Sequence, residues 1–595
     1  MAPLGLDEVR RHLGEAAPGA GWVDLGGREV PGRVLATVLS ELACAQPPRG
    51  VRIDNALVSG DLVLTALDFP SDLGFRRCRF TGVNLSLVEA RIRSISLVGG
   101  CEFQGRLNLA GARVEEDLDM TGAFFRSGID LTGAVVHGAV VATDLRAWSY
   151  GGQPAIAGGR LQVDGSMFID HSQGASGEPG PASPVEGDEG GGPSIHGQLA
   201  LSGASIRGEL RVDQQVQVPG GAAFTAMKLS VGRLLTVHGS IQGSVRLDGA
   251  DIEGELNATE LDLTAPGPWE AGGAISLSAA NSRIGGALFL NKCDVAGTVC
   301  LREAKVGGQL NATSSRFGAK GLALAAAGLS VTGPMYLNGE TSRAFYAAGL
   351  VELCDSHVTG QLDLEKAELA GGVDLRDATV GPLTDQEAQW SGPLRIDGFV
   401  YARLPDSETW QHRAQWLRMA SKYSAQPWQQ AAKVYLASGR DVDARKLTVA
   451  GQNARLKTEP PANKSWKWLL RVTTGYGHEP LRLVPYVAFL LALVTGLSYY
   501  AIRHNELVAV NPPVGATHLQ SAHCQPKVYL CPNAFLYSLD VVVPVVNLHQ
   551  RDNWTVDTGT AMGQVVDDVD VVAMFAGWSI AALAGAALTG VLKMS

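Results

Sequence analysis

The sequence predicts a mainly β protein: a parallel β-solenoid, followed by a small α-helical linker and two transmembrane helices. An eleven-residue phrase repeats without a gap between Arg106 and Val136. The 72 glycines and 6% aromatic residues suit narrow coils with small corners and interiors that lack room for rings. Two long apolar runs lie near the C-terminus. A unit this short cannot bury its apolar side alone, so it must stack on copies of itself.

Each repeat unit has the pattern of a strand, a corner and a second strand. Three consecutive units occupy residues 107–114, 118–125 and 129–136, with the sequences LNLAGARV, LDMTGAFF and IDLTGAVV. Apolar residues alternate as a half-buried strand requires, and a Gly-Ala pair supplies the corner. Two units are expected to complete one coil.

The sequence predicts an N-terminal cap, a solenoid and an insert within the solenoid. Residues 1–50 show helical spacing of apolar residues and end at Pro47-Pro48, which predicts an N-terminal cap over the first coil. The solenoid is expected over 51–383, or about fifteen coils and a rod of roughly 70 Å. Residues 172–194 are rich in Gly, Pro, Ser and acids, which predicts a disordered insert.

The repeat resembles that of a known family. Ala112, Ala123 and Ala134 occupy a small position two residues before an apolar one, with a five-residue step inside each unit. This pattern is similar to the pentapeptide-repeat right-handed β-helix, whose coils have four sides. The resemblance implies a right-handed solenoid. The extra residue in each eleven departs from that family, so the coil cross-section stays open.

Residues 384–482 are expected to form a helical linker with an interfacial segment. Helices are predicted over 427–437 and 442–456, a stretch that resembles one tetratricopeptide-like helical hairpin. We interpret the pair as a packing adaptor, with a peptide-binding site as the alternative. Trp466, Trp468 and Tyr476 are expected to anchor the chain at headgroup level. The TTGYG sequence at 473–477 resembles a potassium-channel filter but precedes any apolar span, so it is assigned to the interfacial segment.

Residues 483–595 are predicted to form a membrane module. Spans are expected at 483–502 and 571–592, because neither run contains a charged residue and each is long enough to cross a bilayer. The loop between them covers 503–570. Basic residues precede the first span and follow the second, and acids lie between the spans. Both termini are therefore expected in the cytoplasm. The protein is expected to be a multi-pass protein of the cell inner (plasma) membrane.

The loop between the spans contains two features that indicate function. Cys524 and Cys531 flank a short polar stretch, which predicts a disulfide; the other six cysteines are expected to be small buried thiols. Residues 533–547 are apolar but too short to cross, which predicts a re-entrant or interfacial segment. Asp540 lies in its middle. It is either a polar intramembrane residue that lines a pore or an acid turned to water.

Gly577, Ala581 and Gly585 repeat at four-residue spacing in the second span. Small residues at this spacing allow close helix approach in lipid. The three residues are therefore predicted to form a helix-packing face, against either the first span at Gly496 or a second copy of the chain.

The order of repeats, linker and paired spans resembles a family of bacterial membrane-associated repeat proteins, some of which carry an automatic oxidoreductase label. The sequence shows no cofactor motif, no P-loop and no catalytic triad pattern, so we expect no cofactor, no metal site and no enzyme. The net charge of −10 argues against nucleic acid as a partner.

The favoured function is a membrane-anchored cytoplasmic solenoid that acts as a scaffold or protein-binding surface. Its partners are then the lipid bilayer and a protein of unknown identity. The alternative is a small homo-oligomeric ion channel in which 533–547 re-enters the membrane and the solenoid regulates it. An oxidoreductase is third.

Overall fold

The computed structural model describes residues 3–16, 21–45, 50–82, 84–149, 151–172, 194–268, 273–340, 342–458, 472–473, 480–510, 521, 524, 530–543 and 545–589. These form two compact units, which are treated separately below. One unit is Met1–Glu408 with Met419–Gln430, and the other is Thr409–Arg418 with Ala431–Ser595. The expected insert at 172–194 falls outside the described residues except at its two ends.

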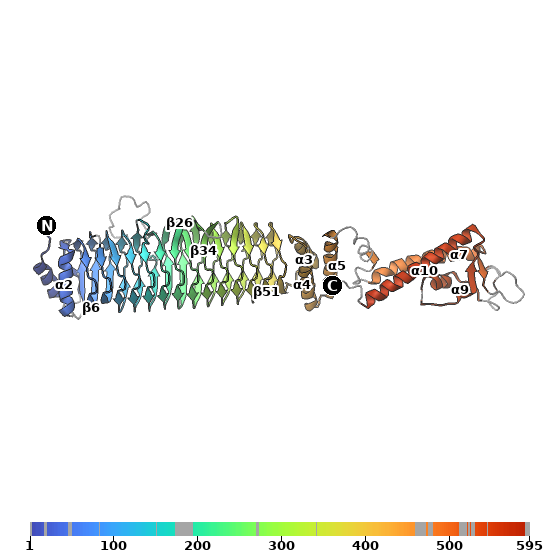
Figure 1. The fold of residues 1–595 in the computed structure, drawn as a ribbon, viewed down its shortest axis with the longest axis horizontal. Helices are drawn as coiled ribbons and strands as arrows, with labels where there is room; N and C mark the ends of the chain where they lie inside the picture. The colour runs from blue at the N-terminus through green and yellow to red at the C-terminus, as the bar shows by residue number, and fades with distance from the viewer. Residues whose placement is uncertain are drawn as a thin grey trace. The chain divides into compact units, whose positions relative to one another are not determined.

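The first unit contains a parallel β-solenoid that runs from β3 (Val51–Asp54) to β54 (Val400–Arg403) in about fifteen turns. Its short strands stack into two sheets, which have 26 and 28 strands within the described residues. Figure 1 shows the strands of successive turns lying side by side along the solenoid. The strands of five or more residues are β6 (Asp68–Arg76), β9 (Arg91–Val98), β26 (Gln215–Thr225), β28 (Leu234–His238), β29 (Ser240–Arg246), β34 (Ala274–Ser278) and β51 (Thr379–Thr384). The predicted solenoid is confirmed.

One complete coil consists of two sequence repeats. The four strands of such a coil are β12 (Arg113–Val114), β13 (Leu118–Asp119), β14 (Phe124–Phe125) and β15 (Ile129–Asp130). In the ladder Leu107 pairs with Ile129, and Val114 pairs with Val136, so each residue lies next to its equivalent two units later. Like residues therefore stack on like residues.

The corner inside each repeat requires a left-handed backbone. Gly111, Gly122 and Gly133 have φ between 66° and 69°. Lys292 and Glu303 occupy the same corner in later repeats with φ of 58° and 55°. A side chain in this conformation costs about 1–2 kcal/mol relative to glycine, which the ladder hydrogen bonds on both sides of the corner offset. Glycine is therefore preferred at the corner but is not obligatory.

The solenoid interior is filled by inward apolar side chains. Ala112, Ala123 and Ala250 are buried at the small positions. Phe80, Phe103 and Phe125 stack on successive coils with ring centroids 4.5 Å apart. The expectation that these coils have no room for rings is therefore wrong in the N-terminal part, where a column of rings fits because flat rings repeat at the spacing of the coils.

The free thiols of the solenoid mostly follow the prediction. Cys78, Cys101, Cys293 and Cys300 are buried. Cys354 is half-buried and Cys44, on a helix of the cap, is exposed; Cys44 differs from expectation because its helix presents it to solvent.

The N-terminal cap combines helices with the first strands of the ladder. Its helices are α1 (Leu6–Ala16) and α2 (Gly32–Ala45), and α2 packs against β5 (Leu62–Val63) and β6. Strand β1 (Val23–Asp24) pairs with β3, and β2 (Glu29–Pro31) pairs with β4 (Leu57–Ser59). The stacking therefore begins inside the segment predicted as a cap.

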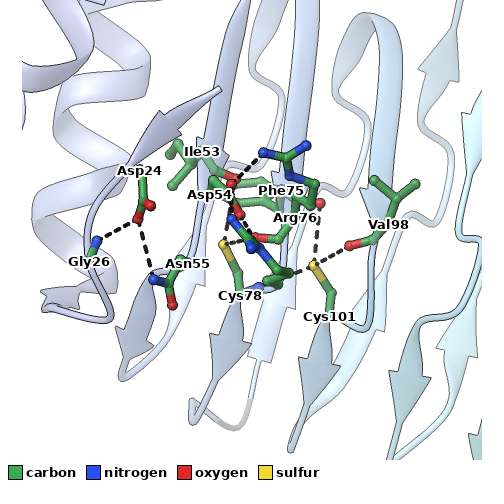
Figure 2. Close-up of polar contacts among 11 residues, drawn as sticks. Asp24, Gly26, Ile53, Asp54, Asn55, Phe75, Arg76, Cys78, Val98 and Cys101 are labelled. Carbon is green, nitrogen blue, oxygen red and sulfur yellow. Dashed lines mark hydrogen bonds and ion pairs between the residues drawn. The ribbon is translucent and has the colours of Figure 1, made fainter. Parts of the chain in front are cut away.

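A cluster of charged residues and thiols lies in the first coils (Figure 2). The buried Asp54 forms ion pairs with Arg76 and Arg77. Burial alone would raise the pKa of Asp54, but the two guanidinium groups hold it below its ordinary value. Beneath them the backbone N–H of Cys78 points to the sulfur of Cys101 at 3.5 Å. The cluster joins three successive coils next to the cap.

The ladders continue past residue 383. Strands β52 (Gln389–Trp390), β53 (Leu394–Arg395) and β54 add a final coil. The start of α4 (Gln426–Ala437) covers this coil, since Gln426 bonds the backbone of Gly398 and Phe399, and Gln430 donates to the carbonyl of Tyr401 at 2.8 Å. The first turns of this helix therefore act as the packing adaptor that the sequence predicts.

The rest of α4, from Ala431, and the remaining helices belong to the second unit. Helices α4 and α5 (Asp441–Thr458) match the predicted pair, whereas α3 (Trp410–Arg418) was not predicted. Helix α3 packs against α5, and its Arg413 lies over the ring of Trp416. The C-terminal elements are η2 (Pro480–Leu483), α7 (Val484–Arg503), β55 (Leu507–Ala509), α8 (Ala534–Val542), α9 (Gln550–Asn553), β56 (Trp554–Val556) and α10 (Ala561–Leu588).

Candidate functional site in the C-terminal helical module

Two helices of this module are long and apolar enough to cross a membrane: Leu481–Arg503 and Ala561–Ala587. Only 17% of each apolar window is buried. Phe489, Val572, Phe575 and Trp578 are between 58% and 70% exposed. Large apolar side chains in such numbers are unfavourable in water. The surface of both helices therefore suits contact with lipid.

The second helix begins earlier than the span predicted at 571–592. Helix α10 starts at Ala561, where the Thr560 hydroxyl accepts a hydrogen bond from the N–H of Gly563 at 2.9 Å. The predicted loop 503–570 thus ends near Thr560, and Asp567, Asp568 and Asp570 lie on the helix. The sequence prediction started the span after the last acid, but helix formation needs only a cap and tolerates acids near the N-terminus. Residues 590–592 lie outside the described chain.

The interior of the module contains a polar pair that the sequence analysis missed. Asp570 is 3% exposed, and the hydroxyl of Tyr537 donates to its Oδ2 at 3.1 Å. Its Oδ1 has no hydrogen-bond partner within the described residues. The available signal was the helical spacing of Val566, Asp570 and Ala573, which places the acid on the buried face.

A second polar contact joins the first candidate span to the short helix. Thr495 on α7 and Ser538 on α8 form a hydroxyl–hydroxyl hydrogen bond of 2.7 Å. Helix α8 is capped by Asn533, whose side chain accepts from the N–H groups of Phe535 and Leu536. The segment predicted at 533–547 is therefore a short helix followed by a chain reversal, and the helix packs on both long helices.

Asp540 binds backbone atoms of its own chain. Its two oxygens accept hydrogen bonds from the N–H groups of Leu548, Gln550 and Arg551 at 2.6, 2.8 and 3.2 Å. Three charge-assisted bonds of this kind fix the reversal between α8 and α9. The described chain thus gives Asp540 a structural role at a half-buried position.

The three small residues of the predicted packing face have different surroundings. A Cβ added at Gly577 would lie 2.0 Å from the carbonyl oxygen of Val542, at the end of α8. Ala581 is exposed, and Gly585 has no neighbouring atom within 4 Å of an added Cβ. Gly496 on the first span also has none. Within one chain the close contact is therefore Gly577 with α8, and not Gly585 with Gly496.

The described part of the loop region contains the disulfide and a hydrogen bond between His549 and Asp552. Cys524 and Cys531 are joined by a disulfide with Cα atoms 5.6 Å apart. A hydrogen bond from His549 is the largest cause that lowers the pKa of Asp552, and a hydrogen bond from Asn547 also lowers it. The three proposed interfacial anchors, Trp466, Trp468 and Tyr476, lie outside the described residues, as does most of the TTGYG stretch. Among the residues that are described, no group of three His, Cys, Asp or Glu side chains could hold a metal ion.

The fold defines a class: a parallel β-solenoid protein with a C-terminal module that carries two candidate membrane-spanning helices. A scan against protein-family models gives no match, and searches of curated proteins and of solved structures give none. The pentapeptide-repeat and bacterial-family resemblances thus receive no support from these comparisons, and the solenoid assignment rests on the ladder geometry alone.

Proposed function

We propose that the chain is a membrane-anchored scaffold without catalytic activity, and that its solenoid presents a binding surface for a protein partner in the cytoplasm. The observation that carries this proposal is the exposed apolar surface of α7 and α10, with only 17% of each window buried. Such a surface is stable in lipid, and two antiparallel spans anchor the attached solenoid on one side of the membrane.

The outer faces of the solenoid are the proposed binding surface. Its interior is filled by stacked side chains, so a partner can contact only the outward residues. These form columns along the ladders, as in Arg91, Arg113, Val135 and Gln162, which pair in successive coils. Such columns give an extended surface of the kind that other repeat proteins use for binding.

The two redox states of cysteine support the proposed orientation in the inner membrane. Cys524 and Cys531 form a disulfide between the candidate spans, whereas the other six cysteines are free. Disulfides persist in oxidising compartments and are rare in the cytosol. This distribution fits an extracytoplasmic loop and a cytoplasmic solenoid, as does the charge bias of the flanking segments.

Membrane fractionation and a topology assay test the proposal. We expect the full chain to stay in the membrane pellet after an alkaline carbonate wash. An impermeant thiol reagent applied to intact cells should fail to label the exposed Cys44, and should label it after permeabilisation. A soluble chain would contradict the anchor, and labelling of Cys44 from outside would contradict the orientation.

The contacts of Asp540 favour the anchor over the alternative ion channel. A selectivity ring needs carboxylate oxygens that face the pore, and both oxygens of Asp540 already accept backbone hydrogen bonds. Reconstituted protein should therefore show no conductance that changes with Asp540→Asn. The oxidoreductase interpretation has no supporting match.

A further inference from the structure

An apolar groove runs along α7 beside the start of α8. Its floor consists of Ala488, Ala492 and Gly496, and its walls include Leu491 and Phe535. Tyr499 lies at one end, and the groove has a volume of about 640 Å³. This volume is within the ordinary range of ligand sites. The groove lies on a surface that the proposed function places in lipid.

The groove is an open one that lies between small and large side chains. Ala488, Ala492 and Gly496 are small and exposed, and Gly496 has no atom within 4 Å of an added Cβ, whereas Phe535 and Tyr499, which also line the groove, are each 53% exposed. The hydroxyl of Thr495 is engaged by Ser538, so it adds no free polar group. The lining is therefore apolar over about 17 Å of helix, at 1.5 Å per residue from Ala488 to Tyr499.

A cation marks the Tyr499 end of the groove. The Nε of Arg503 donates to the hydroxyl of Tyr499 at 3.0 Å, and its guanidinium carbon lies 5.2 Å from the centre of the Tyr499 ring. Arg503 is exposed at the last residue of α7. Guanidinium groups bind phosphate oxygens with a matched, often bidentate geometry. The site thus combines an apolar groove with a phosphate-binding group at its end.

We propose that this groove binds an anionic glycerophospholipid, with one acyl chain along Ala488, Ala492 and Gly496 and the phosphate on Arg503. The proposal rests on the membrane insertion of the module proposed above. A second helix fits the site less well, because a helix is about 10 Å wide and the exposed Phe535 and Tyr499 rings border the groove. A single hydrocarbon chain is narrower and can lie along the small residues.

The test uses the full chain in nanodiscs of phosphatidylcholine with a minor fraction of phosphatidylglycerol that carries a photoreactive acyl chain. Crosslinked peptides are then mapped by mass spectrometry. We expect crosslinks to concentrate between Ala488 and Tyr499. Gly496→Leu fills the floor and should reduce them at least fivefold. Gly585→Leu is the matched control, because Gly585 also has open space but lies outside the groove, and it should leave them unchanged.

The headgroup contact has its own variants. Arg503→Gln should remove the preference for photoreactive phosphatidylglycerol over a photoreactive phosphatidylcholine, and Arg503→Lys should retain most of it. Equal labelling along both long helices would overturn the proposal, as would a crosslink from a cysteine at position 496 to a second copy of the chain. A chain that remains membrane-bound with uniform labelling contradicts the lipid site alone, whereas failure to insert contradicts the proposed function.

Discussion

The solenoid and the C-terminal helical module use apolar side chains in opposite ways. In the solenoid Ala123 and Val136 point inward and are buried. In the module Phe489 and Phe575 point outward and are exposed. Both regions are rich in apolar residues, so composition does not distinguish them. The difference lies in the sequence pattern. The eleven-residue repeat shows which side chains point into the coil, whereas an uninterrupted apolar helix has no polar face that would show which side is exposed to water.

The two regions also differ in how they satisfy backbone polar groups. Each solenoid strand bonds to the coil before and the coil after it, so its stability depends on neighbours far apart in sequence. The long helices satisfy their own backbone internally, and they are joined through side chains such as Val494, Val541 and Val566 in one apolar cluster. Damage should therefore spread between neighbouring coils in the solenoid and stay at a single contact in the module.

The strongest test of the solenoid interior is Ala123→Arg. The position is fully buried, so the variant overpacks the coil and buries an unpaired charge. We expect a loss of about 4 kcal/mol of local stability. Hydrogen exchange should show lost protection in the coils on both sides of residue 123. Arg113→Ala, on the outer face of the same coil, should change the local stability by no more than about 0.5 kcal/mol. Unchanged protection in Ala123→Arg would refute the inward assignment.

The corresponding test in the module is Gly577→Leu. An added Cβ already approaches the carbonyl oxygen of Val542 at 2.0 Å, so a larger side chain must separate α10 from α8. We expect a loss of about 1–3 kcal/mol in detergent unfolding. Gly585→Leu places the same side chain in open space and should be nearly neutral. Equal effects of the two variants would show that another chain covers Gly585.

The disulfide exists only in the module, so reduction should lower the stability of the module and leave that of the solenoid unchanged. Cys524 and Cys531 are 7 residues apart, and closing a loop this short stabilises the folded chain by about 2 kcal/mol. A mild reductant, or Cys524→Ser with Cys531→Ser, should lower the stability of the module by this amount. The solenoid should keep its thermal transition, which circular dichroism at a β-sheet wavelength can follow. A shift of that transition would show that the stability of the solenoid depends on the disulfide.

Acid should weaken the first coils through Asp54. Its folded pKa is below the ordinary value, so its ion pairs contribute stability that is complete above about pH 4 and is lost as the pH falls through the folded pKa. Arg76 and Arg77 are 38% and 57% exposed at the side chain, and solvent screening limits the effect to about 1 kcal/mol. Hydrogen exchange of residues 51–82 between pH 5 and pH 3 measures it. Asp54→Asn should reduce the pH dependence, and an unchanged dependence would contradict this origin.

Much of the solenoid could be predicted because its determinants are local and repeated. The alternation in 107–114 defines two strands and a corner, and repetition then defines the stack. The cap strands β1 and β2 were missed because their units lack the repeated phrase. The ring column of Phe80, Phe103 and Phe125 was missed because it depends on the coil register, which sets residues of successive coils face to face.

The module was less predictable because its contacts join segments that are distant in sequence. The apolar runs indicate both long helices, but no local pattern predicts that Asp540 binds the backbone of Leu548 and Gln550 across a chain reversal. Asp570 is one of the acids that the sequence analysis uses only for the charge bias between the spans, whereas its helical spacing to Val566 places it on the buried face. Gly577 and Gly585 belong to the same four-residue spacing, so the sequence does not distinguish them. Gly577 alone of the two contacts another helix, because α8 lies against it.

The side-chain amides of Gln426 and Gln430 bond carbonyls of the last coil, and helix α2 packs on β5 and β6 near the first. Non-repeat elements therefore lie at both ends of the stack and cover part of the backbone edge that another strand could pair with. Whole coils between these ends can nevertheless be gained or lost without changing either terminal contact. On the proposed function, the number of coils would set the length of the surface that a partner can contact.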